Sequence, residues 1–109
     1  MFGNPMNTIE KAIKKKNAAA LIKLADNSDM KIKLAAIDGL SKVADQDSTN
    51  FLVTRLHNEE PEVRIAVAQA LGTIGDMHTK AFIYQQMNNE KNPEVHEALG
   101  KAMVQIKDY

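Results

Sequence analysis

The dipeptide His96–Glu97, in the stretch VHEALG (95–100), is the pattern in this sequence closest to a metal-binding motif. A di-iron centre is built from imidazole nitrogens and carboxylates that converge from more than one helix. The two other histidines, His57 and His78, are not followed by an acid. One His–Glu pair cannot supply such a centre, so we expect no metal and favour a solvated pair in the first turn of a helix.

The lysine run 14–16 could form a patch for nucleic acid or for lipid headgroups. It also suits the C-terminus of a helix, where cations interact favourably with the helix dipole. Surfaces that bind nucleic acid usually contain more basic residues, together with aromatic side chains on which bases stack. Aromatic residues make up 5 % of this chain and tryptophan is absent, so nucleic-acid binding is not expected.

Other kinds of catalytic or cation site lack the residues that they require. No serine lies in a Gly-x-Ser-x-Gly elbow, and no glycine-rich loop could hold a phosphate. Asp26 and Asp29 lie in the short segment ADNSDMK, which lacks the glycine and the distal glutamate of a calcium loop. Cysteine is absent, which excludes disulfides, thiolate metal sites and a cysteine nucleophile. We therefore expect no enzymatic activity and no cofactor.

Length and composition indicate one domain that spans residues 1–109. Apolar residues make up 44 % of the chain and charged residues 26 %, which is typical of a globular protein with one core. The 14 basic and 14 acidic residues balance, so no overall charge attracts nucleic acid or an anionic membrane. The sequence has neither the apolar core of a signal peptide nor an apolar run of about 20 residues. We expect no membrane contact and a cytoplasmic location.

Three stretches of the sequence align with one another: MKIKLAAIDGLSKVAD (30–45), PEVRIAVAQALGTIGD (61–76) and PEVHEALGKAMVQIKD (93–108). Their apolar residues coincide at the spacing i, i+3, i+4, i+7, i+8 and i+11, which is the buried stripe of an amphipathic helix. In the middle copy the stripe consists of Val63, Ala66, Val67, Ala70, Leu71 and Ile74. A shorter apolar helix is expected before each copy, over 18–25, 50–57 and 80–87. Each short helix and the copy that follows it form a helix pair. A single helix pair cannot bury its apolar face, whereas stacked pairs share one core.

Helix-end signals support this division of the chain. Pro61 and Pro93 fit the first turn of a helix, and Gly75 fits a helix C-terminus. A further helix is expected over about 8–16, with Asn7 or Thr8 as its cap. No segment alternates with period two, so strands are not expected. We predict an all-α protein, an α-solenoid with a right-handed superhelix, made of an N-terminal helix and three helix pairs (about 17–45, 46–76 and 77–108).

The stretch PEVRIAVAQALGTIGD resembles the second helix of a HEAT repeat, especially the short HEAT-like type of phycobilisome lyase repeat proteins. The pattern of that type is Pro-x-Val-Arg, then Ala and Ala-Leu-Gly, then Ile-Gly-Asp. The resemblance covers about residues 17–108 and implies an armadillo-type α-solenoid. The outer copies depart from the pattern, with Lys33 and His96 opposite Arg64, and with Ser41 and Val104 opposite Gly72.

The resemblance also implies roles for single residues. The arginine at the position of Arg64 braces neighbouring repeats in such proteins, here against an acid such as Asp45 or Asp76. Alternatively, its planar guanidinium could bind a ligand carboxylate or phosphate. The His–Glu pair is similar to those of deoxyhypusine hydroxylase, a HEAT-like enzyme that binds two irons through several such dipeptides. HEAT-like DNA glycosylases would need a larger and more basic groove.

Second helices line the concave surface in solenoids of this type. The residues that point away from the buried stripe then form rows across the repeats: Leu34, Asp38, Ile65, Gln69, Thr73, Glu97, Lys101 and Gln105. Leu34 and Ile65 are apolar, and they either bind a partner on this face or pack against each other between adjacent helices.

These residues predict a non-catalytic interaction module or scaffold that binds a peptide or protein on its concave face. The alternatives are an accessory subunit of a HEAT-like lyase or metal-dependent hydroxylase, and a weak nucleic-acid binder. Self-association through an end repeat is a further possibility, because Val104 replaces a glycine on a helix that no later repeat covers.

Overall fold

The computed structural model describes residues 4–108, and within that range it contains helices but no strand. The prediction of an all-α protein is confirmed. The helices are, in chain order, α1 (Pro5–Lys14), α2 (Ala18–Leu24), α3 (Met30–Val43), α4 (Gln46–Thr54), α5 (Pro61–Ile74), the short 3-10 helix η1 (Met77–Thr79), α6 (Lys80–Asn89) and α7 (Pro93–Gln105).

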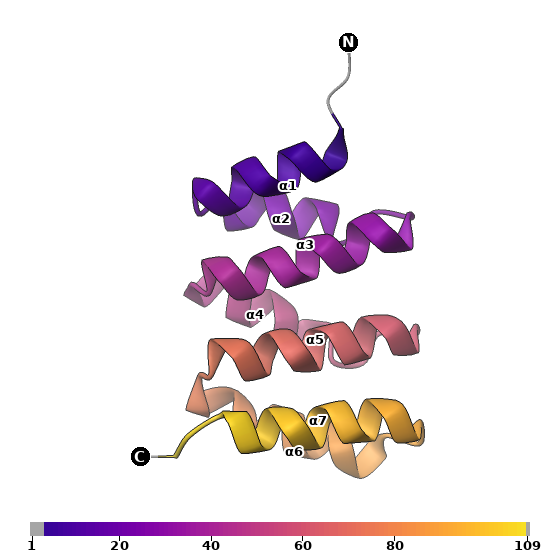
Figure 1. Ribbon diagram of the computed structural model, residues 1–109. Coiled ribbons are helices and arrows are strands. Elements are labelled where there is room, and N and C mark those ends of the chain that lie inside the picture. The colour runs from indigo at the N-terminus through magenta and orange to yellow at the C-terminus, as the bar shows by residue number, and fades with distance from the viewer. Residues whose placement is uncertain (1–3, 109) are drawn as a thin grey trace.

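The helices form two layers (Figure 1). α1, α3, α5 and α7 lie one beside the next in one layer, and α2, α4 and α6 lie behind them. Each helix of the first layer packs mainly against its neighbours in that layer and against the short helix of its own pair, as expected of a solenoid. The body measures 47 × 30 × 17 Å. α1 takes the place of a second helix, so it covers the first pair (α2–α3) at the N-terminal end.

The core lies between the two layers and is filled by the repeated stripe. In α5 the stripe residues Val63, Val67 and Leu71 are fully buried, while Ala66 and Ile74 at its margins are half-buried. The short helices each insert one branched residue with no exposed surface: Leu21, Leu52 and Ile83. Burial of one such side chain stabilises the fold by about 2 kcal/mol, so the sum over three pairs provides the main driving force for stacking.

Gly72 allows α7 to pack closely against α5. A Cβ atom at this position would collide with the side-chain amide of Gln105 and would lie 3.1 Å from the Cα atom of Ala102. The equivalent residue in α3 is Ser41, which is buried, and in α7 it is Val104, which is exposed. Within the layer of α1, α3, α5 and α7, the helices are therefore packed most closely between α5 and α7.

Several helix ends differ from the expected ones, and two of the helix starts differ because their capping side chains lie outside the apolar stripe. α1 begins at Pro5 and not near residue 8, since Pro5 fits the first turn and the Asn4 side chain accepts a hydrogen bond from the Met6 amide at 2.8 Å. α4 begins at Gln46 and not at 50, since Asp45 caps it by accepting from the Ser48 amide at 2.8 Å. α7 ends at Gln105, before Asp108.

The turns after α3 and α5 both require a left-handed residue. Gly75 follows α5 with φ +75°, as expected from the sequence. Ala44 follows α3 with φ +57°, a conformation that costs a residue with a Cβ atom about 1 kcal/mol relative to glycine.

Candidate partner-binding face

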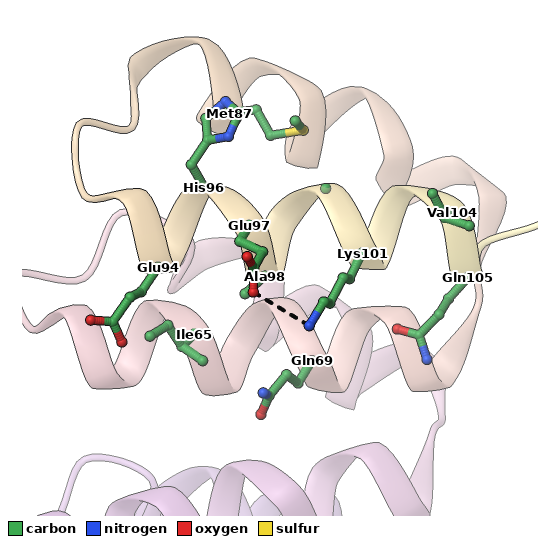
Figure 2. Close-up of a pocket in the computed structure, with 11 residues that line it drawn as sticks. Ile65, Gln69, Met87, Glu94, His96, Glu97, Ala98, Lys101, Val104 and Gln105 are labelled. Atoms are coloured by element: carbon green, nitrogen blue, oxygen red, sulfur yellow. Dashed lines mark ion pairs between the residues drawn. The ribbon is translucent and has the colours of Figure 1, made fainter.

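Two adjoining grooves cross the outer face of the α3–α5–α7 layer. The larger, of about 870 Å³, lies along α7 (Figure 2), and the smaller, of about 350 Å³, lies between α3 and α5. Ile65 and Gln69 of α5 line both grooves, so they form the ridge between them. Such grooves arise because small residues hold the helices close at their base, including Ala66, Ala70 and Ala98.

All eight residues expected on the partner-binding face line one of these grooves. Leu34 and Ile65 are half-buried and pack against the core, yet each keeps one side in a groove. Both side chains therefore pack within the solenoid and also expose a surface toward a groove. The other six are exposed: Asp38, Gln69, Thr73, Glu97, Lys101 and Gln105. The sequence placed these residues on one face, and the structure brings them together there.

The charges of this face are distributed unevenly. Asp38 pairs with Lys42 and Glu97 with Lys101, each at 3.4 Å within one helix. Two exposed acids lie in the first turns of helices. Glu62 of α5 lies at one edge of the smaller groove, and Glu94 of α7 lies at the corresponding edge of the larger groove. In the described part of the chain neither carboxylate belongs to an ion pair, so this edge is acidic along α5 and α7, whereas the equivalent residue of α3 is the exposed Lys31. The grooves thus offer an apolar floor beside an acidic edge.

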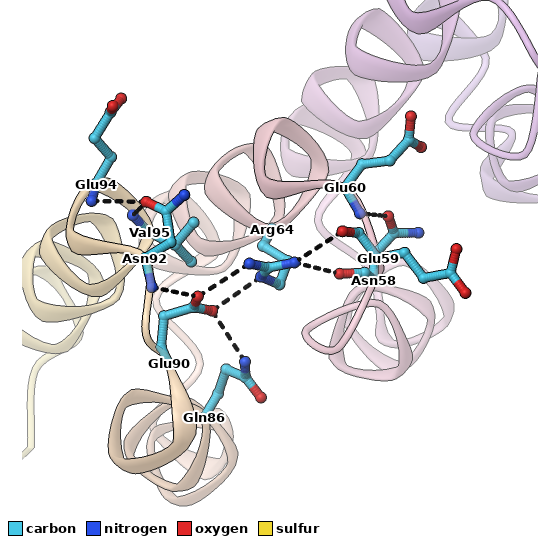
Figure 3. A network of polar contacts seen from close by, with 9 residues as sticks. All are labelled: Asn58, Glu59, Glu60, Arg64, Gln86, Glu90, Asn92, Glu94 and Val95. Atoms are coloured by element: carbon cyan, nitrogen blue, oxygen red, sulfur yellow. Dashed lines mark hydrogen bonds and ion pairs between the residues drawn. The ribbon is translucent and has the colours of Figure 1, made fainter.

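Arg64 points away from the grooves into a network between two repeats (Figure 3). Its Nε and Nη2 atoms donate to the two oxygens of Glu90 at 2.9 and 3.0 Å, and its Nη1 donates to the Asn58 carbonyl at 2.7 Å. The Glu90 side chain is only 3 % exposed and that of Arg64 16 %. Arg64 therefore joins α5 to the loop before α7, which leaves its guanidinium occupied by the protein itself.

The acid that pairs with Arg64 was predicted incorrectly. Asp45 and Asp76 do not contact it, because their carboxylates accept hydrogen bonds from the Ser48 and His78 amides at 2.8 and 2.9 Å and cap α4 and η1. The partner is Glu90, which lies outside the three aligned stretches. Burial alone would raise the pKa of the Glu90 carboxyl. Hydrogen bonds from Arg64, Gln86 and the Asn92 amide lower the pKa by more than burial raises it, so it lies below that of an ordinary glutamate.

A weaker version of this contact joins the first two repeats. Lys33, which aligns with Arg64, donates to Glu60 at 2.7 Å from α3 to the start of α5. The Glu60 side chain is 43 % exposed, so this pair is partly screened by water. His96 aligns with the same two residues and lies exposed on α7. This aligned position thus holds a cation that joins two repeats in α3 and in α5, and an exposed histidine in α7.

The histidines do not gather into a metal site. His57 lies after α4, His78 in η1 and His96 in α7, and the His78 ring lies 3.0 Å from the nearby Asp76 carboxylate. Within residues 4–108 no group of three or more histidine, cysteine, aspartate or glutamate side chains could hold a metal ion. Lys14, Lys15 and Lys16 lie exposed at the end of α1. In the same range, no helix combines the length and the apolar character that crossing a membrane requires.

Comparisons with known proteins agree with this architecture. The model of the family of HEAT repeats matches residues 12–108, nearly the whole chain. No curated protein matches the sequence. A solved structure of epoxyqueuosine reductase from Bacillus subtilis is similar in fold, with a TM-score of 0.71 and 22 % identity over 80 % of this chain and 28 % of that one. At that identity the likeness concerns the fold alone, and this chain spans little more than a quarter of the reductase. From the repeated stripe, the stacked helix pairs and the family match, the chain belongs to the HEAT-repeat family.

Proposed function

We propose that this HEAT-repeat module is a non-catalytic scaffold that binds a protein segment across the two grooves of the α3–α5–α7 face. The observation that carries the proposal is the ridge at Ile65, where an apolar side chain stays half-exposed between two adjoining hollows. Apolar side chains that keep a free side in a concave surface favour the burial of a partner's side chain.

The acidic edge suggests the chemistry of the partner. Glu62 and Glu94 lie at equivalent positions of successive repeats, so their carboxylates form a row along one edge of the grooves. A segment with an aliphatic or aromatic residue over Ile65 and a lysine or arginine toward this row would satisfy both features. Catalysis by this face is not proposed, since its ionisable groups are exposed and paired within single helices or solvated.

Charge reversal at the acidic edge tests the proposal without disturbing the core. The full chain and the double variant Glu62→Lys/Glu94→Lys would be used to capture proteins from a cell extract, and captured proteins would be identified by mass spectrometry. We expect the double variant to lose a protein that the unchanged chain retains, because like charges now face the partner's basic residues.

Asp47 provides the matched control. It is also an exposed acid in the first turn of a helix, but it lies on α4 in the other layer. Asp47→Lys removes the same favourable interaction with a helix dipole and should leave capture unchanged. Equal recovery of the partner by the double variant and by the unchanged chain would refute the proposed face.

A further inference from the structure

The charge of the partner-binding face changes along the direction of its helices. Glu62 and Glu94 lie in the first turns of α5 and α7, and within residues 4–108 neither carboxylate belongs to an ion pair. The middle of the face holds ion pairs that lie within single helices. Thr73 and Gln105, both uncharged, line the opposite end, and Figure 2 shows Glu94 and Gln105 at opposite ends of α7. Along α5 and α7 the face is therefore acidic at one end and uncharged at the other.

Apolar side chains lie between these two ends. Leu34 and Ile65 are half-buried and border the smaller groove, and Ile65 also borders the larger one. Ile65 lies about one turn from Glu62 on α5. Because α5 lies between α3 and α7 (Figure 1), a segment that lies along α5 would place its middle on these apolar side chains and one end between the two unpaired carboxylates.

A helix fits this face better than an extended segment does. An extended segment needs partners for its backbone N–H and C=O groups. Within residues 4–108 the face consists of helices, which bond their own backbone and offer no strand edge. Equivalent positions in the middle of the face hold Asp38, Gln69 and Lys101, so no repeated side-chain amide could replace such an edge. A helix satisfies its own backbone, and the stretch from Glu62 to Thr73 is about 16 Å long, which is about three helical turns.

The acidic end sets the direction of that helix. Lysine or arginine stabilises a helix when it lies in the last turn, and opposes the helix dipole when it lies in the first turn. A helix that brings cations to Glu62 and Glu94 is therefore most stable when its C-terminal end lies there, antiparallel to α5 and α7. Lys31 holds the equivalent position of α3 and would repel these cations, so they belong over α5 and α7.

We infer that the occupant of the face is an amphipathic helix that lies antiparallel to α5. Its apolar stripe packs on Leu34 and Ile65, and lysine or arginine in its last turn lies between Glu62 and Glu94. The inference rests on the proposed function and adds the conformation, the direction and the charge pattern of the bound segment.

A pair of synthetic peptides of equal composition tests the direction. Each has about 14 residues, or about four turns, with leucines on one face, alanine and glutamine elsewhere, and a pair of lysines in one terminal turn. The lysines occupy the last turn of one peptide and the first turn of the other. Fluorescence anisotropy with the full chain should show about fivefold tighter binding of the peptide with lysines in its last turn, as expected of two exposed charge pairs. A photoreactive group at the last residue of this peptide should cross-link to the first turns of α5 and α7.

Two variants and a further peptide serve as controls. Lysines in a first turn weaken a helix by themselves, so Glu62→Lys/Glu94→Lys separates this effect from binding, and the preference between the peptides should be lost in that variant. Asp47→Lys, on α4 in the other layer, should keep the preference. A peptide with lysines in its last turn and with prolines in its middle cannot form the helix and should bind at least about tenfold more weakly.

Equal affinity for the two helical peptides, cross-links near Thr73 and Gln105, a preference that Glu62→Lys/Glu94→Lys retains, or undiminished binding of the proline peptide would each overturn the inference. So would the absence of binding by both helical peptides. Capture of a partner from a cell extract that depends on Glu62 and Glu94 would then leave the proposed function standing, whereas the loss of that dependence refutes the proposed function itself.

Discussion

Replacement of Arg64 by methionine should destabilise the protein far more than the same change at the aligned residue Lys33. Methionine keeps most of the aliphatic stem and removes the charged group. In Arg64→Met the buried Glu90 carboxylate loses two short hydrogen bonds and keeps only those from Gln86 and the Asn92 amide, at 3.1 and 3.2 Å. Removal of one partner from a buried ion pair typically costs about 3 to 5 kcal/mol.

The exposure of the two pairs sets the expected magnitudes. Glu90 is 3 % exposed, so water cannot replace the lost donors, and we expect a loss of about 3 kcal/mol in the free energy of unfolding. Glu60 is 43 % exposed, so Lys33→Met should cost at most about 1 kcal/mol. For a chain of this size, the Arg64 change corresponds to a decrease in Tm of roughly 12 °C or more.

Urea unfolding followed by far-UV circular dichroism measures both variants, and a double-mutant cycle separates the causes. Glu90→Gln removes the buried charge, so in the Arg64→Met background it should restore part of the lost stability. A loss for Arg64→Met no greater than that for Lys33→Met would refute the argument that burial makes this contact strong. So would a Glu90→Gln change that further destabilises the Arg64→Met variant.

Three further changes have expected outcomes in the same unfolding assay. Because the folded-state pKa of Glu90 is lowered, this carboxylate stabilises the protein above the pKa of an unfolded glutamate, and the stabilisation is lost as the pH falls through the lower folded pKa. In Arg64→Met the free energy of unfolding should therefore fall less steeply with decreasing pH below about pH 5. An unchanged slope of the free energy of unfolding against pH would contradict this. Ala44→Gly should raise the free energy of unfolding by about 1 kcal/mol, because it relieves the left-handed backbone at φ +57°, and no gain would show that the turn relaxes. Gly72→Ala should lower it by about 1 to 2 kcal/mol, because the added Cβ would displace the Gln105 side chain and lie 3.1 Å from the Ala102 backbone of α7. Gly100→Ala, whose Cβ would make only an ordinary contact with Met87 at 3.8 Å, should be neutral or stabilising by up to about 1 kcal/mol.

The sequence predicted those features that repeat and missed those that depend on single loops. The apolar stripe recurs at offsets of 31 and 32 residues, and this recurrence determines the layers, the core and the face on which Ile65 and Gln69 lie. All of these follow from helix periodicity, which one chain displays three times. The fold and the composition of the grooved face were therefore predictable.

Helix starts were harder to predict because they depend on side chains outside the stripe. The aligned stretch ends at Asp45, yet this side chain caps the next helix by accepting a hydrogen bond from the Ser48 amide. Asn4–Pro5 repeats the Asn92–Pro93 signal that opens α7, so the start of α1 could have been found by comparison.

The partner of Arg64 lies 26 residues away, in a loop whose path the stripe does not specify. Lys33 and Glu60 are separated by 27 residues. A search for acids at a matching interval after each aligned cation would have found Glu90. Periodicity thus carries information about polar contacts between repeats as well as about the core.

The unequal ion pairs between repeats imply that cooperativity is uneven along the solenoid. In a stack of repeats the stability of each unit depends on its coupling to the adjacent ones. The buried Arg64–Glu90 pair and the close contact at Gly72 couple the last two repeats strongly, whereas the more exposed Lys33–Glu60 and Arg55–Asp26 pairs couple the first two weakly. Partial opening should therefore begin at the junction of α3 and α5, so that amide protons of α2 and α3 exchange with solvent before those of α5 and α7. The smaller groove spans this junction, and a partner bound there would slow that exchange by holding the two halves together.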